Sequence, residues 1–180
     1  MNTTKALQQF KNIAFHYLHE LENFSMEQLE RQPSKDEWSI GQMYQHLINS
    51  ALYMHLHNIE HCMQSKNETV SSAEKTTAGA KIFEQGGFPP IRIKVPPSPQ
   101  YTPEQPKSKE QLVQGMNIVI HRMEETEPKL EKASKQNTIS HPSFGALHAK
   151  EWFVLIEMHY RHHLLQLERL KKELEKNNYV

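Results

Sequence analysis

The sequence LHAKEWFVLIEMHYRHHLLQLERLKKELEKN, residues 147–177, decides the fold class of this 180-residue chain. Apolar and histidine side chains recur in it at steps of three and four residues, which is the period of one helix face. Its last turns are rich in lysine and glutamate, which suits a solvent-exposed helix end. The stretch therefore predicts a long amphipathic helix from about Leu147 to Asn177. Its inner face carries Trp152, Ile156, His159, His163, Leu167 and Leu170.

Three further stretches repeat this helical period. They cover residues 4–31, about Ser39–Gln64 and about Lys109–Glu127, and Pro128 should kink or end the third. In the second stretch, Ser39 and Gln42 have the spacing of a capping box, which favours a helix start there. Four amphipathic helices of this length predict an all-α four-helix bundle.

The connection between the second and third helices, residues 66–107, has a different composition. Seven of the ten prolines lie between Pro89 and Pro106, and no helical period is present. The stretch IRIKV (91–95) fits at most a short extended piece. We expect an ordered, extended crossover that packs across the bundle, because prolines restrict the unfolded chain as well. No hairpin pattern is evident, but His141-Pro142 and Gly145 predict a turn before the last helix.

Composition and charge exclude several classes of function. Lysine plus arginine and aspartate plus glutamate each number 21, so the net charge is zero, which argues against nucleic-acid binding. The longest apolar run, Trp152–Ile156, is far too short to span a bilayer. The first residues lack the apolar stretch of a signal peptide, and Cys62 is the single cysteine. We expect one cytoplasmic domain over residues 1–180.

Histidine is the unusual residue type, with 12 copies. His159 and His163 are four residues apart, so both imidazoles lie on one helix face, where they can reach one metal ion. In so histidine-rich a chain such a pair also arises by chance, and local hydrogen bonding remains an alternative. His162 is the rival ligand, because it lies three residues from His159 and could also chelate an ion with it. It points about 100° away from His163, however, so local contacts or water are the preferred interpretation for it. His46, alone among apolar residues, is by itself typical of a core histidine.

A second histidine set lies near the end of the second helix. His57 and His61 are four residues apart, with His55 nearby, so this is an alternative metal site in a part that we expect to be more exposed. The remaining histidines belong to no pattern and are interpreted as surface or interhelix residues: His16, His19, His121 and His148. No repeated Glu-x-x-His motif, glycine-rich phosphate loop or nucleophile elbow is present.

Two motifs in the chain resemble those of the DinB/YfiT-like superfamily. WSIGQMYQHLINS (38–50) resembles its second-helix signature, and HPSFGALHAKEWFVLIEMHYRHHLLQLERL (141–170) resembles its final helix. The latter is similar to a branch with His-Pro-x-Phe-Gly and His-x-x-His-His-Leu-x-Gln. The resemblance implies an up-down-down-up bundle with a divalent metal held by His46, His159 and His163. Zinc, nickel, iron and manganese all suit such nitrogen ligands.

The resemblance also implies an activity. Some relatives resemble S-transferases that use bacillithiol, mycothiol or glutathione. Three neutral imidazoles leave coordination positions open, as a catalytic metal needs. We therefore expect the metal to activate a small thiol for attack on an electrophilic small molecule. A metal-dependent hydrolase and a non-catalytic metal-binding or stress-response interaction bundle are the alternatives.

Several residues are candidates for supporting roles. Gln42, Gln45, Glu157 and Gln166 can orient the ligands, and Tyr44, Tyr53 and Tyr160 can supply a phenol. His141 and Phe144 either line the pocket mouth or form a turn that anchors the last helix, and the turn is the preferred interpretation. The sequence leaves open whether residues 66–107 cover the metal pocket. Homodimerisation is expected, with Leu18, Ile59 and Leu164 as candidate apolar surface.

Overall fold

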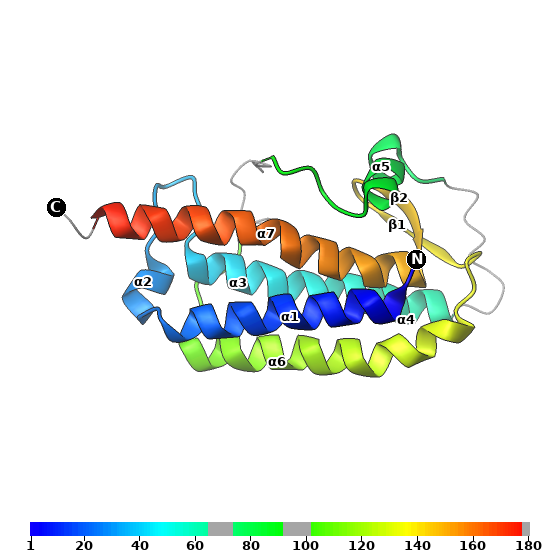
Figure 1. Cartoon of the computed structure of the whole chain (residues 1–180), viewed down its shortest axis with the longest axis horizontal. Helices are drawn as coiled ribbons and strands as arrows, with labels where there is room; N and C mark the ends of the chain where they lie inside the picture. The colour runs from blue at the N-terminus through cyan, green and yellow to red at the C-terminus, as the bar shows by residue number, and fades with distance from the viewer. Residues whose placement is uncertain (65–73, 92–101, 178–180) are drawn as a thin grey trace.

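The structure is a computed structural model that describes residues 1–64, 74–91 and 102–177, and most of these residues are helical. Figure 1 shows the long helical stretches side by side, with a small hairpin and the short helix that precedes it outside them. The long stretches are α1 (Thr3–Glu22), α3 with its extensions (Ile40–Gln64), α6 (Lys109–Thr126) and α7 (Ala149–Asn177). The mostly helical architecture predicted from the sequence is thus present.

The long helices enclose one core. α1 packs on α6 and α7, and α3 packs on the same two helices. In Figure 1, α1 and α7 run towards the left, whereas the stretch 40–64 and α6 run towards the right. Large side chains from all four stretches are fully buried between them, and burial of this kind supplies most of the stability of a bundle. They include Phe10, Tyr17, Tyr44, Leu47, Met116, Trp152, Phe153 and Tyr160.

The first helix is shorter than predicted. It ends at Glu22, and a separate short helix, α2, covers Met26–Glu30. The reason is a second capping box: the Ser25 side chain accepts from Gln28 N, and the Gln28 side chain accepts from Ser25 N. These bonds satisfy free amides of a new helix start, so the chain turns after residue 22.

The second helix begins as predicted but changes its winding. Ser39 caps α3 (Ile40–Asn49) in a capping box with Gln42. A π-helix, η1 (Ser50–Leu56), follows α3 and leads into α4 (His57–Gln64). The stretch therefore runs to Gln64 as expected, but its middle does not follow the α-helical period.

The third helix also begins as predicted, at Lys109. It ends at Thr126, and a 3-10 helix, η2 (Glu127–Lys132), contains Pro128 near its start. The expectation that Pro128 ends or kinks this helix is confirmed, because proline removes one backbone hydrogen bond of an α-helix.

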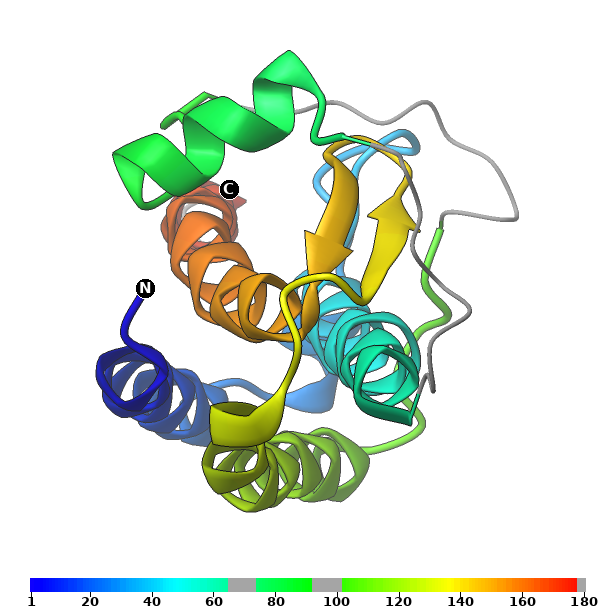
Figure 2. The same ribbon diagram turned by 90° about the vertical axis from the view of Figure 1, so that its right-hand side faces the viewer.

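The prediction that residues 66–107 contain no helix is wrong. α5 covers Thr77–Gln85, and its first turn is capped by the side chain of Thr76, which accepts from Gly79 N. Gly86 ends it in the left-handed conformation, at φ 67°. Figure 2 shows α5 beside α7, where Arg161 donates to Gly86 O at 2.6 Å. Most of the IRIKV piece lies outside the described residues.

The absence of a hairpin was also predicted wrongly. β1 (Thr138–His141) and β2 (Gly145–His148) pair antiparallel, with His141 opposite Gly145. The predicted turn at His141-Pro142 closes this hairpin, and Gly145 adopts φ 74°. Backbone bonds from Thr76 N to Phe144 O and from Ala146 N to Glu74 O attach it to the segment before α5. Because the chain is extended to His148, the last helix begins at Ala149, two residues later than expected.

The apolar residues proposed as a dimer surface lie elsewhere. Ile59 is fully buried, and Leu18 and Leu164 are partly buried against the core. They therefore do not form an exposed patch, and homodimerisation stays a prediction. In the part of the chain that the structure describes, none of the helices has the length and hydropathy needed to cross a bilayer.

Candidate metal centre

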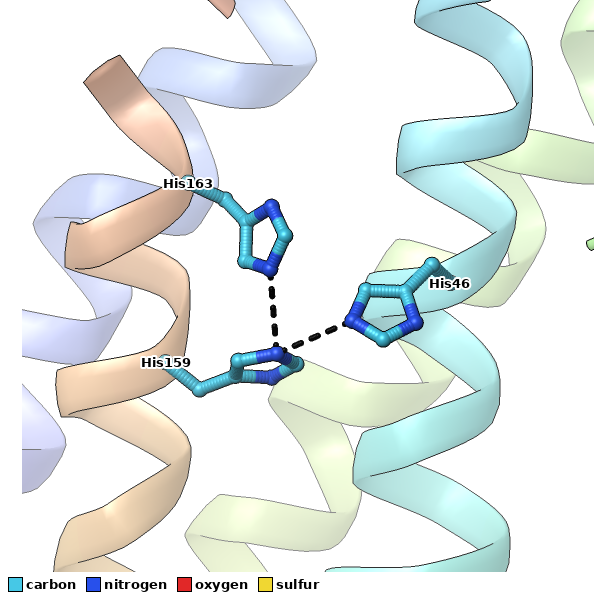
Figure 3. Close-up of side chains that lie close together, drawn as sticks. All are labelled: His46, His159 and His163. Carbon is cyan, nitrogen blue, oxygen red and sulfur yellow. Dashed lines mark hydrogen bonds between the residues drawn. The ribbon is translucent and has the colours of Figure 1, made fainter. Parts of the chain in front are cut away.

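Three histidine side chains meet between α3 and α7, and Figure 3 shows their rings directed at one another. His46 comes from α3, and His159 and His163 come from successive turns of α7. The Nε2 atom of His159 lies 3.0 Å from Nε2 of His46 and 3.1 Å from Nε2 of His163. The structure thus brings together the three residues that the sequence resemblance implied, and they form a cluster that can hold a metal ion.

Hydrogen bonds alone do not account for this arrangement. A neutral imidazole nitrogen is either a donor or an acceptor, so His159 Nε2 cannot satisfy both neighbours with one proton. Nitrogens bound to one ion at about 2.1 Å are about 3.0–3.4 Å apart for right-angled to tetrahedral geometry. The spacing of the three Nε2 atoms and their chemistry therefore fit a divalent cation, which gives each nitrogen the same partner.

Burial keeps the three imidazoles neutral, as metal ligands must be. Loss of solvation lowers the pKa of His46 to about 4 and that of His163 to about 3. The pKa of His159 falls well below its ordinary value, first through burial and then through the neighbouring histidines. All three residues are nevertheless half-buried rather than buried, so the cluster lies close to the surface.

Two polar side chains support the ligands from outside. Gln166 Oε1 lies 2.7 Å from Nδ1 of His163, so an Nδ1–H of that ligand donates to the amide oxygen. Ser50 Oγ lies 3.5 Å from Nδ1 of His46. Such contacts fix the ring orientation and the tautomer of a metal-binding histidine. Gln166 was one of the candidates from the sequence, whereas Ser50 was missed, although its spacing of four residues from His46 could have indicated it.

Among the other supporting candidates, the two glutamines, Glu157 and Tyr44 have hydrogen-bond partners elsewhere. Gln42 is used in the capping box and donates to Pro103 O, and Gln45 donates to Asn49. Glu157 accepts from Arg161. Tyr44 donates its phenol to Tyr17 O, Tyr160 packs on Phe10 and Tyr17, and Tyr53 is exposed. The expectation that one of these tyrosines supplies a phenol at the cluster has no support in these contacts.

Two aromatic rings lie beside the histidine cluster, one just before α3 and one just after α5. The ring centroid of Trp38 lies 4.9 Å from that of His46. Phe88, which follows α5, lies 5.4 Å from His162 and 6.5 Å from His159, again between ring centroids. Sequence reasoning missed both roles, although Trp38 stands in the quoted second-helix motif. The described part of the long crossover thus supplies one wall beside the histidines.

The loop before the last helix lies beside this wall. His141 stacks on Phe144 at a centroid distance of 4.3 Å, and Phe144 lies 5.6 Å from Phe88. Nδ1 of His141 accepts from Ser143 N, which stabilises the hairpin turn. The residues therefore form a turn before α7, as preferred from the sequence, and the same turn contacts the aromatic border of the cluster.

The remaining histidines divide into a buried one and several exposed ones. His55, expected near solvent, is buried, and its ring centroid lies 5.5 Å from that of His159. His57 and His61 lie with ring centroids 4.3 Å apart, but the described residues give them no third ligand. His148 Nδ1 accepts from Glu151 N in the first turn of α7. His16, His19 and His121 are exposed, as expected.

Comparison with known proteins gives a consistent picture. The profile of the DinB superfamily matches residues 13–167, a range that contains all three clustered histidines. The uncharacterized protein YuaE of Bacillus subtilis (strain 168) is 24% identical over 161 residues, which cover 87% of this chain and 91% of YuaE. A search of the solved structures found no match.

Proposed function

The chain belongs to the DinB superfamily, and from this premise we propose that it is a divalent-metal-dependent S-transferase. In this proposal it joins a low-molecular-weight thiol, such as bacillithiol, mycothiol or glutathione, to an electrophilic small molecule. The long helices serve as the up-down-down-up bundle expected from the sequence, and His46, His159 and His163 hold the ion.

The observation that carries the proposal is the convergence of three neutral histidine Nε2 atoms close to the surface. Three ligands leave further coordination positions for a small molecule, whereas a structural site is usually closed by four protein ligands. A divalent ion bound there supplies a Lewis acid that lowers the pKa of a thiol. Zinc, nickel, iron and manganese all accept this nitrogen set.

The chain's own residues have distinct tasks in this proposal. Gln166 keeps the proton of His163 on Nδ1 and thereby leaves its Nε2 lone pair free for the ion. Trp38 and Phe88 provide apolar surface beside the ligands, which favours electrophiles with an apolar or flat body. Excluding water with such side chains also protects the thiol from competing proton transfer.

The first test is elemental analysis of untagged protein, with His46→Ala, His159→Ala and the control His57→Ala. His57 lies on the same helical stretch but is exposed and does not belong to the three-histidine group. We expect about one equivalent of metal per chain, lost in the first two variants and retained in the control. Absence of metal after reconstitution with zinc, nickel, iron and manganese would refute the proposal and favour a non-catalytic bundle.

The second test separates the thiol reaction from hydrolysis. The metal-loaded protein is incubated with a panel of electrophiles in the presence and absence of each thiol, and products are identified by mass spectrometry. A conjugate that requires protein, metal and thiol supports the S-transferase. Turnover without thiol identifies a hydrolase that uses the same site, and no turnover under any condition contradicts an enzymatic role.

A further inference from the structure

A fourth histidine lies behind the three clustered ones. His55 is only 2% exposed, and its Nδ1 atom has no hydrogen-bond partner among the described residues. Its ring lies between two others, with centroid distances of 5.5 Å to His159 and 5.8 Å to Trp152. A buried polar atom without a partner is costly, so a native structure normally provides one.

The neighbouring ligand His159 also has a buried ring nitrogen without a hydrogen-bond partner. Its Nε2 atom faces the cluster, but its Nδ1 atom is buried and has no partner in the described part of the chain. A histidine bound to metal through Nε2 carries its proton on Nδ1, and that N–H almost always donates to a second group. His163 has Gln166 for this purpose, and His46 has Ser50 nearby. His159 alone of the three has no such contact.

The π-helix explains how His55 reaches this place. His55 is nine residues after His46, and nine residues of a regular α-helix make about two and a half turns, so its side chain would point to the opposite side. The wider turns of η1 (Ser50–Leu56) rotate less per residue and direct His55 into the interior towards α7. Single π-helical turns are often found at functional sites.

We propose that His55 is a positioning residue of the metal centre and that its Nδ1 atom accepts the hydrogen bond from Nδ1–H of His159. The 5.5 Å between ring centroids is closed by one bridging water or by a small rotation of the His55 ring. With the rotation His55 accepts directly from His159, whereas a bridging water accepts from His159 and donates to His55; in both cases the ring plane of His159 is fixed. This inference rests on the proposed metal binding.

Other nearby groups do not offer the same partner. Nδ1 of His141 is already used by Ser143 N. The indole of Trp152 has only an N–H donor, which is itself without a partner, so it cannot accept from His159. Among these three rings, His55, in the tautomer with its proton on Nε2, is the one with a nitrogen free to accept.

The test uses the full chain loaded with cobalt(II), whose visible absorption reports ligand geometry. We compare the wild type with His55→Phe, which keeps a ring but removes both nitrogens, and with His55→Gln, which keeps an acceptor oxygen. His57→Phe, two residues away and exposed, is the control. We expect a 10- to 100-fold weaker cobalt affinity and an altered spectrum for His55→Phe, with substantial recovery in His55→Gln and no change in the control.

Unchanged affinity and spectrum in His55→Phe would overturn this inference while leaving the metal site intact. A wild type that binds no cobalt would instead refute the proposed function. Should His55→Phe fail to fold, nuclear magnetic resonance of the zinc-loaded wild type with labelled histidine provides the answer. The contact between His55 and His159 is supported by a slowly exchanging Nδ1 proton on His159 that is lost in His55→Leu or shifted in His55→Gln. A rapidly exchanging Nδ1 proton in the wild type excludes this contact.

Discussion

The buried histidines make the metal-free protein sensitive to mild acid. Burial lowers the pKa of His46 and His141 to about 4 and that of His55 and His163 to about 3. In the unfolded chain each returns to a pKa of about 6.5. Below pH 6.5 the unfolded chain therefore binds more protons than the folded one, so stability is complete above that pH and falls as the pH drops.

The size of this effect follows from the same values. Each of the four histidines contributes a loss of about 1.4 kcal/mol per pH unit between its two pKa values. Between pH 6.5 and pH 5 this amounts to about 2 kcal/mol for one histidine taken alone. The four losses do not simply add, because, beyond burial, His46 and His141 contribute to the lowered pKa of His55, and His46 contributes to that of His163. A typical domain has about 5–15 kcal/mol of stability in total. A loss of a few kcal/mol by pH 5 is thus a large share of the stability that the metal-free chain can have.

Urea unfolding followed by circular dichroism, after treatment with a chelator, measures this loss at pH 7.5, 6.5, 5.5 and 5.0. His55→Gln should recover about 2 kcal/mol of the loss between pH 7.5 and 5.0, because one buried titrating group is removed. His57→Gln, at an exposed position, should leave the pH profile unchanged. A total loss below about 2 kcal/mol, or identical profiles for wild type and His55→Gln, would refute the reasoning.

Four further substitutions test the surroundings of the cluster and the turns near it. Gln166→Leu removes the partner of one ligand, so zinc should bind about tenfold or more weakly by competition titration; unchanged affinity would deny the glutamine this role. Phe88→Ala should raise KM for the electrophile and leave the metal content unchanged, and equal KM values would place the substrate elsewhere. Gly145→Ala should lower the free energy of unfolding by about 2–3 kcal/mol, because its φ is 74° and a Cβ would lie 2.5 Å from Glu74 O. Gly86→Ala, with φ 67° but open space, should cost only about 1 kcal/mol, and equal losses at both glycines would contradict the steric argument.

Periodicity predicts the long helices because each of them buries one continuous face. The start of the second helix was predictable from Ser39 and Gln42, since a capping box is a local interaction between residues close in sequence. The spacing of His159 and His163 indicated one shared face, which the structure confirms. The pairing of this face with His46 came only from the family resemblance, because contacts between helices leave no period in the sequence.

Short elements escaped prediction for a different reason. α5 covers only Thr77–Gln85, too few turns for a clear period, and it is defined by its caps at Thr76 and Gly86. The hairpin strands of four residues each are stabilised by contacts with the segment before α5, so their own sequence carries little signal. The π-helix Ser50–Leu56 was not predicted, because steps of three and four residues describe a regular α-helix and not its wider turns.

These unpredicted elements are the ones that surround the histidine cluster. A regular amphipathic helix offers one buried face and one exposed face, so straight helices alone place ligands but provide few side chains around them. Phe88 after α5, Phe144 in the hairpin and His55 in the π-helix fill those places. In the proposed function, the bundle therefore sets where a metal binds, and we expect the irregular elements to set which molecules reach it. It follows that relatives sharing the three ligands but differing in these elements should keep metal binding and differ in substrate.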